Sequence, residues 1–595
     1  MNWSEEVLTS LIWVAKTLII TSLVFSLILA ILTKITRWGR QFWLLARDYL
    51  SPKQSLKPLC YFWVIIFFNL ISVRLDILFS EWYNAMYSAL QDMNEKIFWQ
   101  QMLLFSFLAS IHVLNILLTY YLSQRFKIQW RIWLNQCYLE KWLSNQAYYK
   151  TQHSLTQIDN PDQRIQQDIE SYIERSLSLA TGVISSTVSL IAFTAILWNL
   201  SGPMNVAGYE IPHMMVFLVF IYVFFTSLIA FKIGSPLIKL NFINEKLNAN
   251  YRYSLIRLKE YAESIAFYRG EKVELHLLNT QFHKIITNIW QLIYRTLKLS
   301  GFNLTVSQVS VIFPFLIQAV RYFNQQIKLG DLIQTAQAFG KVQSSLSFYR
   351  NSYDDFAAYR AVLDRLTGFH TAINTTIQQS QIQDSDGEII FHNLTIKRPD
   401  NKTLISDLNF TLPLGESLLI QGRSGVGKTT LLRTIAGLWP YSEGDIICPQ
   451  KALFLSQKPY LPQGKLIDAI YYPEKINDSQ DMTPIIEIMH KVNLGHLVNR
   501  LKEENDWTQI LSLGEQQRLA FARLLLHKPR VAFLDEATAS MDEGLEEAMY
   551  YLLKTSLPST TIISVGHRST LMNHHHLHLK INDDTHWELI VNEYD

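Results

Sequence analysis

Long apolar runs upstream of residue 350 are the feature that most restricts how this chain can fold. A helix of about 20 apolar residues is long enough to cross the hydrocarbon core of a bilayer. We identify seven such runs, the last of which is polar enough to need shelter by neighbouring helices. They cover residues 11–33, 61–78, 102–122, 179–200, 214–233, 306–323 and 332–348. The first half of the chain is therefore predicted to be a multi-pass α-helical membrane domain.

The first run is interpreted as a retained span rather than a secretory signal. It follows acidic residues, it is longer than the apolar core of a signal peptide, and no small-residue cleavage site follows it.

The distribution of basic residues predicts the orientation of the spans. Residues 34–57 contain six Lys or Arg and one acid, whereas residues 81–96 contain three acids and one Lys. We therefore expect the N-terminus outside and everything after the seventh span in the cytoplasm. Two long charged connections, 123–178 and 234–303, are predicted to be cytoplasmic extensions of the membrane helices.

Composition divides the chain into two parts. Hydrophobic residues make up 49% of the sequence, yet the last third resembles an ordinary soluble protein. The 53 basic and 51 acidic residues are nearly balanced, which argues against a nucleic-acid partner. The three cysteines are far apart and in no metal-ligand spacing, so we expect neither a disulfide framework nor a zinc site.

A glycine-rich loop opens the last third of the chain. The sequence GRSGVGKTT has the spacing G-x-x-x-x-G-K-T, with an apolar strand before it and a helical run after it. Its backbone N–H groups and the start of the helix would bind phosphate oxygens of ATP, Lys428 would neutralise the β- and γ-phosphates, and the Thr429 hydroxyl would hold Mg²⁺. The predicted nucleotide-binding residues are Gly422, Arg423, Ser424, Gly425, Val426, Gly427, Lys428, Thr429 and Thr430.

Four further motifs follow the loop in order: FLSQKPYLPQG, LSLGEQQRLAFARLLLHKP, RVAFLDEATASMD and TIISVGH. Together they resemble the ATP-binding cassette of ABC transporters, an α/β P-loop NTPase. The resemblance implies that Asp535 and Gln457 join Thr429 around Mg²⁺ and that Glu536 polarises the attacking water. It also implies that Gln457 senses the membrane domain and that His567 contacts the γ-phosphate.

The motif LSLGEQQR resembles the ABC signature, which binds the nucleotide held by the other subunit. Ser512 and Gly514 would supply this contact at the start of a helix, and Asp542 would help to join the two sites. One chain has one cassette, so a homodimer is the simplest assembly. Two positions depart from the family pattern: Leu513 replaces a common Gly, and Arg398 stands where an aromatic residue usually stacks on adenine.

Three blocks in the membrane half look like the SbmA/BacA-type bacterial transporters and the peroxisomal acyl-CoA transporters of ABC subfamily D. They are SEWYNAMYSALQDMNEKIFW, NPDQRIQQDIE and EYAESIAFYRGEKVE. The resemblance implies a half-transporter of the bacterial inner membrane with a type IV, exporter-type fold and an extra N-terminal helix. The expected parts are residues 1–58 (extra helix and basic segment), 59–366 (six-helix membrane domain), 367–387 (linker) and 388–595 (cassette).

Some alternatives stay open at this stage. An ATP-driven transporter is favoured over an ATP-gated regulator or channel, because a nucleotide sensor has no need of a complete hydrolytic set. The resemblance allows peptides, a cobalamin-like cofactor, or acyl-CoA and fatty acids as cargo, and either direction of transport.

Arg74 and Asp76 lie either in a transport pathway or near the outer end of a span. NPDQR suits helix capping or docking, and the run HHHLH at residues 574–578 suits a strand with solvated histidines rather than a metal tract.

Overall fold

The structure is a computed structural model in which the chain divides into two compact units. It describes residues 3–51, 56–152, 160–202, 204–206, 209–377, 382–383, 388–449, 451–476, 481–582 and 585–592. The helical unit comprises Met1–Leu139 and Asn160–Phe369, and the α/β unit comprises Glu140–Asp159 and His370–Asp595.

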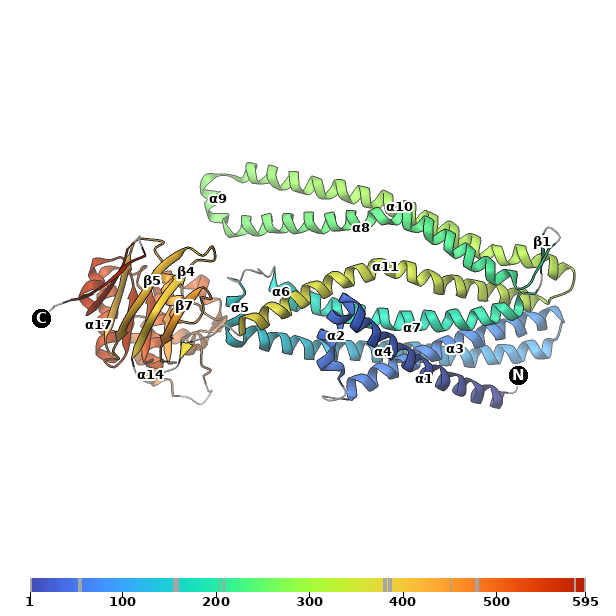
Figure 1. Cartoon of the computed structure of the whole chain (residues 1–595), viewed down its shortest axis with the longest axis horizontal. Coiled ribbons are helices and arrows are strands. Elements are labelled where there is room, and N and C mark those ends of the chain that lie inside the picture. Colours follow the sequence, from blue (N-terminus) through green and yellow to red (C-terminus); the bar gives the residue numbers. More distant parts are fainter. Residues whose placement is uncertain are drawn as a thin grey trace. The chain divides into compact units, whose positions relative to one another are not determined.

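Long helices make up nearly all of the first part of the chain (Figure 1). In order they are α1 (Trp3–Ile35), α2 (Arg37–Leu50), α3 (Lys57–Gln91), α4 (Glu95–Leu143), α5 (Ala147–Lys150), α6 (Pro161–Gln163), a π-helical turn (Arg164–Asp168), α7 (Ile169–Leu200), α8 (Met214–Glu260), α9 (Ala262–Tyr268), α10 (Glu271–Phe323) and α11 (Leu329–Ile377). A short hairpin of β1 (Met204–Val206) and β2 (Tyr209–Ile211) separates α7 from α8.

Among the described residues, six helices are long and apolar enough to cross a membrane. They contain the first six predicted runs and cover Glu6–Ile35, Lys57–Gln91, Glu95–Lys150, Pro161–Leu200, Met214–Glu260 and Glu271–Phe323. The seventh run lies in α11, which is less apolar. Thr335 of α11 is buried and donates its hydroxyl to the Asp331 carbonyl, and Gln334 accepts a hydrogen bond from Asn84 of α3. The polar residues of α11 are thus sheltered by packing, as the sequence predicted.

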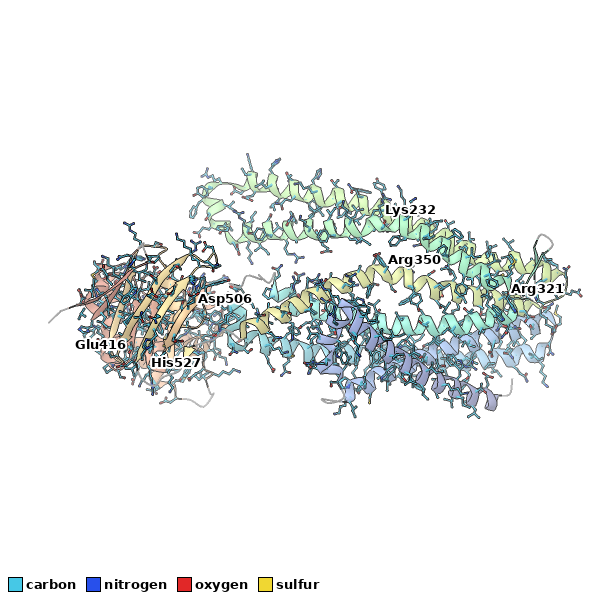
Figure 2. All side chains as sticks on the ribbon, viewed as in Figure 1. Lys232, Arg321, Arg350, Glu416, Asp506 and His527 are labelled. Atoms are coloured by element: carbon cyan, nitrogen blue, oxygen red, sulfur yellow. The ribbon has the colours of Figure 1, made fainter. Side chains whose placement is uncertain are left out.

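Over the residues that the structure describes, the predicted extensions of the membrane helices are mostly helical. Figure 1 shows α8 and α10 side by side, joined at one end by α9. The pair is held together by the Tyr222 hydroxyl, which donates to the Val306 carbonyl at 2.6 Å, and by Asn288, which donates to the Leu240 carbonyl at 3.1 Å. At the end far from α9, Arg321 donates to the Leu200 carbonyl at the end of α7 (Figure 2).

A buried apolar cluster joins α3, α7, α8 and α11 in the helical unit. It includes Ile77, Phe193, Val219 and Phe339, all at most 5% exposed. Because these side chains come from four helices far apart in the sequence, the cluster fixes the order of the helices around it.

Arg74 and Asp76 form ion pairs with different helices. Arg74 donates to Glu6 of α1 at 2.6 Å and to the Ser10 hydroxyl at 3.1 Å, which holds the extra N-terminal helix against α3. Asp76 accepts a 2.6 Å hydrogen bond from Lys341 of α11. The two neighbouring charges therefore have separate partners.

The NPDQR motif does not cap its helix through Asn160. This residue has a left-handed backbone and its side chain makes no cap hydrogen bond, so the expected capping role is wrong. The motif instead leads to Asp168, which is buried and accepts hydrogen bonds from Arg164 and from Arg365 of α11. A buried carboxylate needs such partners, and here they tie this turn to α11.

Among the described residues, the α/β unit contains two larger sheets, several helices and a two-stranded sheet of β9 (Gly464–Lys465) and β10 (Glu504–Asn505). The larger sheet has the order β14-β13-β6-β12-β11-β8 and is parallel apart from β14. Its strands are β6 (Ser417–Gly422), β8 (Ala452–Leu455), β11 (Val531–Asp535), β12 (Thr561–Val565), β13 (Leu577–Ile581) and β14 (Trp587–Val591). The smaller sheet has the order β3-β7-β4-β5, with β3 (Ile382–Gln383), β4 (Ile389–Lys397), β5 (Thr403–Leu412) and β7 (Ser442–Ile447).

In the part of the α/β unit that the structure describes, we find two hydrophobic cores. One joins both sheets to α12 (Lys428–Ile435). The other surrounds α13 (Leu466–Tyr471), α14 (Thr483–Lys491), α16 (Leu513–His527) and α17 (Glu543–Ser556). The helices α12 and α16, which follow the two glycine-containing motifs, therefore belong to different cores.

The histidine run is only partly solvated. The strand begins at Leu577, and the side chains of His575 and His578 are buried, so the expectation that these histidines are solvated is wrong for them. His575 bonds the Leu571 carbonyl and the Ser564 hydroxyl, whereas the exposed His576 lies 3.0 Å from Glu416. In the described part of the chain, no group of three or more His, Cys, Asp or Glu is arranged to hold a metal ion.

Candidate functional site

The loop Gly422–Gly427 connects the central strand β6 to the start of α12. Gly422 has φ +154°, and a Cβ there would lie 2.6 Å from the Ile581 carbonyl oxygen of the adjacent strand β13. Gly427 has φ +114° and a Cβ would lie 3.3 Å from Leu404. Only glycine combines a positive φ with the absence of a Cβ atom, so these two positions of the loop require glycine.

Lys428 is folded back over this loop. Its Nζ donates to the carbonyl oxygens of Gly422 at 2.7 Å and Arg423 at 2.8 Å, and the residue is 6% exposed. Burial lowers the pKa of Lys428 below its usual value, while the nearby carboxylates of Glu536 and Asp535 act in the opposite direction. A cation with carbonyl partners at the mouth of a loop can exchange them for phosphate oxygens.

Four polar side chains lie at or near the carboxyl ends of β11 and β12. Thr429 donates its hydroxyl to Asp535, the last residue of β11, at 3.3 Å. Glu536 follows with φ +51°, and its backbone N–H donates to the Val565 carbonyl at 3.0 Å. His567 Nε2 lies 3.5 Å from Glu536 Oε1. Burial raises the pKa of Asp535 above its usual value, and the hydrogen bond from Thr429 acts in the opposite direction by lowering it. The carboxyl ends of adjacent parallel strands bring these groups together.

Gln457 is exposed. Its backbone carbonyl accepts a hydrogen bond from Gln517, a residue that was not predicted from the sequence to belong to the site. The Gln517 side chain donates from Nε2 to the Gln457 carbonyl at 2.8 Å and accepts from the Ser540 backbone N–H at 3.1 Å. Gln517 is 0% exposed. It therefore connects α16 to the loop with Gln457 and to the turn before Asp542. The only signal in the sequence is a second amide residue in LSLGEQQR next to an apolar helical run.

The signature-like motif forms a capped helix start. Ser512 accepts from the Glu515 N–H, and Glu515 in turn accepts from the Ser512 N–H at 2.9 Å and hydroxyl at 2.8 Å. His496 lies 3.1 Å from the same carboxylate. A Cβ on Gly514 would lie 3.1 Å from the Ser540 carbonyl, and Asp542 caps α17 through the Leu545 N–H. Among the described residues, no hydrogen bond or ion pair joins Ser512 or Asp542 to the P-loop.

Two family models match this chain. The model of the ABC transporter transmembrane region 2 matches residues 45–323, and the ABC transporter model matches residues 405–539. An ABC transporter ATP-binding protein of Haemophilus influenzae is 60% identical over 99% of this chain and 100% of its own length. The chain belongs to the ABC transporter family. Like its relatives, this ABC transporter is an ATPase coupled to transport.

Other relatives agree with the resemblance found in the sequence. The Escherichia coli inner membrane ABC transporter ATP-binding protein YddA is 34% identical over 84% of this chain and 90% of its own length. The Arabidopsis thaliana chloroplastic ABC transporter D family member 2 is 32% identical over 78% of this chain and 74% of its own length. The predicted half-transporter organisation, with a membrane region fused to a cassette, is therefore confirmed.

The exporter-type fold is confirmed by a solved structure. A bacterial Atm1-family ABC exporter with ATP bound superposes with a TM-score of 0.68 at 15% identity, covering 87% of this chain and 93% of that chain. At this identity the comparison establishes the fold of the ABC transporter.

Position 398 holds an arginine, so no aromatic side chain at this position can stack on adenine. Arg398 lies in the turn between β4 and β5, where its N–H donates to the Lys402 carbonyl and its guanidinium lies 3.7 Å from Asp400. This side chain is half exposed, so stacking of Arg398 on a base stays a prediction.

Proposed function

We propose that this half-transporter acts as a homodimer that hydrolyses ATP at two composite sites. The hydrolysis would move a peptide or another large amphipathic molecule across the bacterial inner membrane, with the cassettes in the cytoplasm. The observation that carries the proposal is the assembly of Glu536, His567, Asp535 and Thr429 beside the P-loop.

Glu536 is the proposed base for the hydrolytic water. Its backbone is fixed by the hydrogen bond to the Val565 carbonyl, and its carboxylate lies next to His567. A carboxylate in this position would orient and polarise the water, and His567 would hold the γ-phosphate in the attacking geometry.

The phosphates would be bound by the loop from Gly422 to Thr430. Lys428 would exchange the Gly422 and Arg423 carbonyls for β- and γ-phosphate oxygens, and the N-terminus of α12 would add backbone donors. The oxygens of Thr429, Asp535 and Gln457 suit Mg²⁺, which prefers oxygen ligands. When bound, Mg²⁺ would neutralise charge on the phosphates.

Two features support a dimer with shared sites. The proposed phosphate contacts Ser512 and Gly514 start α16, which belongs to a different core from the P-loop helix. On the charged helical extension, the tip residues Phe267 and Tyr268 are 79% and 87% exposed. Exposed aromatic residues of this kind are typical of surfaces that are covered by a partner.

A polar cavity in the helical unit supports a cargo that carries charged groups. The cavity has a volume of about 410 Å³ and is lined by the Asp76–Lys341 ion pair together with Ser80, Tyr83 and Gln337. Charged pairs within membrane helices are typical of substrate pathways. A peptide, with both positive and negative groups, fits this lining better than an uncharged lipid.

The proposal is tested with the purified protein in lipid vesicles. The wild-type protein should hydrolyse ATP, and one cargo class among peptides, cobalamin and acyl-CoA should stimulate the rate. Glu536→Gln should bind ATP but lose at least about 100-fold in rate, because the base is removed. Hydrolysis by this variant at the wild-type rate would contradict the role of Glu536, and ATP binding without hydrolysis by the wild type would favour a nucleotide sensor.

A further inference from the structure

A partly open apolar chamber lies in the helical unit between α1, α2, α3, α4 and α7. Its volume is about 460 Å³, within the range of about 300–1,000 Å³ that is usual for ligand sites. Aromatic side chains dominate the lining: Phe25, Trp43, Phe62, Trp63 and Trp130. Neither the ATP site nor the polar cavity beside Asp76 includes these residues.

The last turns of α1 line one side of the chamber. Phe25, Leu29 and Thr33 line it at intervals of four residues, so they form a stripe on one face of the helix. At 1.5 Å per residue, the stripe from Phe25 to Lys34 is roughly 13 Å long. An apolar stripe of this length suits a flexible hydrocarbon chain.

Lys34 provides a cation at one end of this stripe. It lines the chamber, it is exposed, and it has no side-chain hydrogen bond or ion pair in the described part of the chain. Two of the basic residues that follow it are already paired, because Arg37 lies 3.0 Å from Asp364 and Arg47 lies 3.2 Å from Asp48. Lys34 is therefore available to an anionic group at the mouth of the chamber.

We propose that the chamber binds one acyl chain of an anionic phospholipid, whose phosphate group lies against Lys34. Lys34 ends the first membrane span, where lipid headgroups meet water, so the cation and the apolar lining match the two parts of a lipid. An acyl chain in the chamber would also make van der Waals contacts with the aromatic side chains that line it, and these contacts are missing when the space is empty. The lipid would bind the extra N-terminal helix to α2 and α3.

This inference goes beyond the proposed function and does not depend on ATP hydrolysis. It is tested by native mass spectrometry of the full-length protein without nucleotide, titrated with palmitoyl-oleoyl phosphatidylglycerol or with the phosphatidylcholine of the same chains. The wild type should bind the anionic lipid more tightly. Lys34→Ala should weaken binding of phosphatidylglycerol about fivefold, because one cation near an anionic headgroup contributes about that factor. Binding of phosphatidylcholine should weaken less, because its choline group already balances the charge of the phosphate.

A second variant tests the chamber itself. Ala30 lines the chamber from an exposed position on α1, so Ala30→Trp should fill it without disturbing the core and should weaken the first binding step for both lipids at least tenfold. The matched controls are Leu27→Trp, on the same helix but outside the lining, and Arg40→Ala, an exposed cation outside the lining. Equal affinity of the wild type for the two lipids, or equal effects of variants and controls, would overturn the proposal.

Discussion

At the residue scale, Gln517 has the most unusual position in the proposed ATP site. It is fully buried, and its amide joins the Gln457 loop to the Ser540 turn through two hydrogen bonds. In Gln517→Glu, the bond from the Ser540 N–H can persist, but a carboxylate oxygen would oppose the Gln457 carbonyl. We expect ATP binding to be almost unchanged and turnover to fall about tenfold, as the loss of a buried hydrogen bond implies.

The matched control for this prediction is Gln516→Glu. Gln516 is also buried, but its amide donates to the Thr508 and Leu511 carbonyls and, among the described residues, makes no hydrogen bond to either loop. Steady-state ATPase rates and nucleotide affinities of the two variants should therefore differ. An equal fall in turnover for both would mean that Gln517 only supports the fold.

His575 makes the stability of the protein depend on pH. The residue is 3% exposed, and burial lowers its pKa from 6.5 to about 4. Above pH 6.5 the residue is neutral in both folded and unfolded chains, so its contribution is fully present. Between pH 6.5 and 4 only the unfolded chain gains the proton, so stability falls as the pH falls, by up to about 3 kcal/mol.

This prediction is checked by thermal unfolding of the full-length protein in detergent between pH 4 and 8. His575→Gln should be less stable at pH 7 and should show a smaller decline toward pH 4. His576→Gln, which changes an exposed neighbour, should keep the wild-type decline. A wild-type decline in His575→Gln would assign the pH dependence to other groups.

At the scale of elements, the turns between long helices report the orientation of the membrane domain. Met93, between α3 and α4, is 90% exposed, and Tyr268, at the end of α9, is 87% exposed. With Cys60, Cys137 and Cys448 replaced, a cysteine at position 93 should react with a membrane-impermeant thiol reagent from outside. A cysteine at position 268 should react only after permeabilisation, because the positive-inside bias places α9 in the cytoplasm.

Within one chain the two positions are nearly equally exposed, and permeabilisation with a detergent that also separates the subunits makes position 268 accessible if the partner covers it. Labelling in intact cells is followed by mass shift on gels. The reversed pattern would invert the proposed topology, and it would place the cassette away from cellular ATP.

At the scale of the whole molecule, the proposal requires that each ATP site contains parts of two chains. Consider a mixed dimer with Lys428→Ala in one chain and Ser512→Arg in the other. One site would combine both damaged parts, and the other would combine an intact P-loop with an intact signature. About half of the wild-type ATPase sites should therefore survive in this arrangement.

The control arrangement places both substitutions in the same chain and pairs it with a wild-type chain. Each site then contains one damaged part, so activity should fall much further. The rates are measured on differently tagged heterodimers purified through both tags. Equal rates in the two arrangements would show that the sites do not form across a dimer interface.

Much of this molecule could be predicted from its sequence because the signals are local. The P-loop depends on glycines within six residues of one another, and the first six membrane spans depend on runs of adjacent apolar residues. Both kinds of signal follow from backbone geometry and solvation of a short segment, without reference to the rest of the chain. The motif order in turn identified the ABC transporter family.

Only the tertiary structure decided which distant side chains meet. Asp76 pairs with Lys341, Asp168 with Arg365, and Gln517 with the loops at residues 457 and 540. The same is true of His575, which looked solvated in a polar run but is buried against Ser564. Partners of this kind are chosen by the packing of whole helices and strands, because a buried polar group must find a partner wherever the fold places it. The sequence by itself therefore determined the membrane spans and the motifs of the ATP site, and the packing determined the contacts that hold them together.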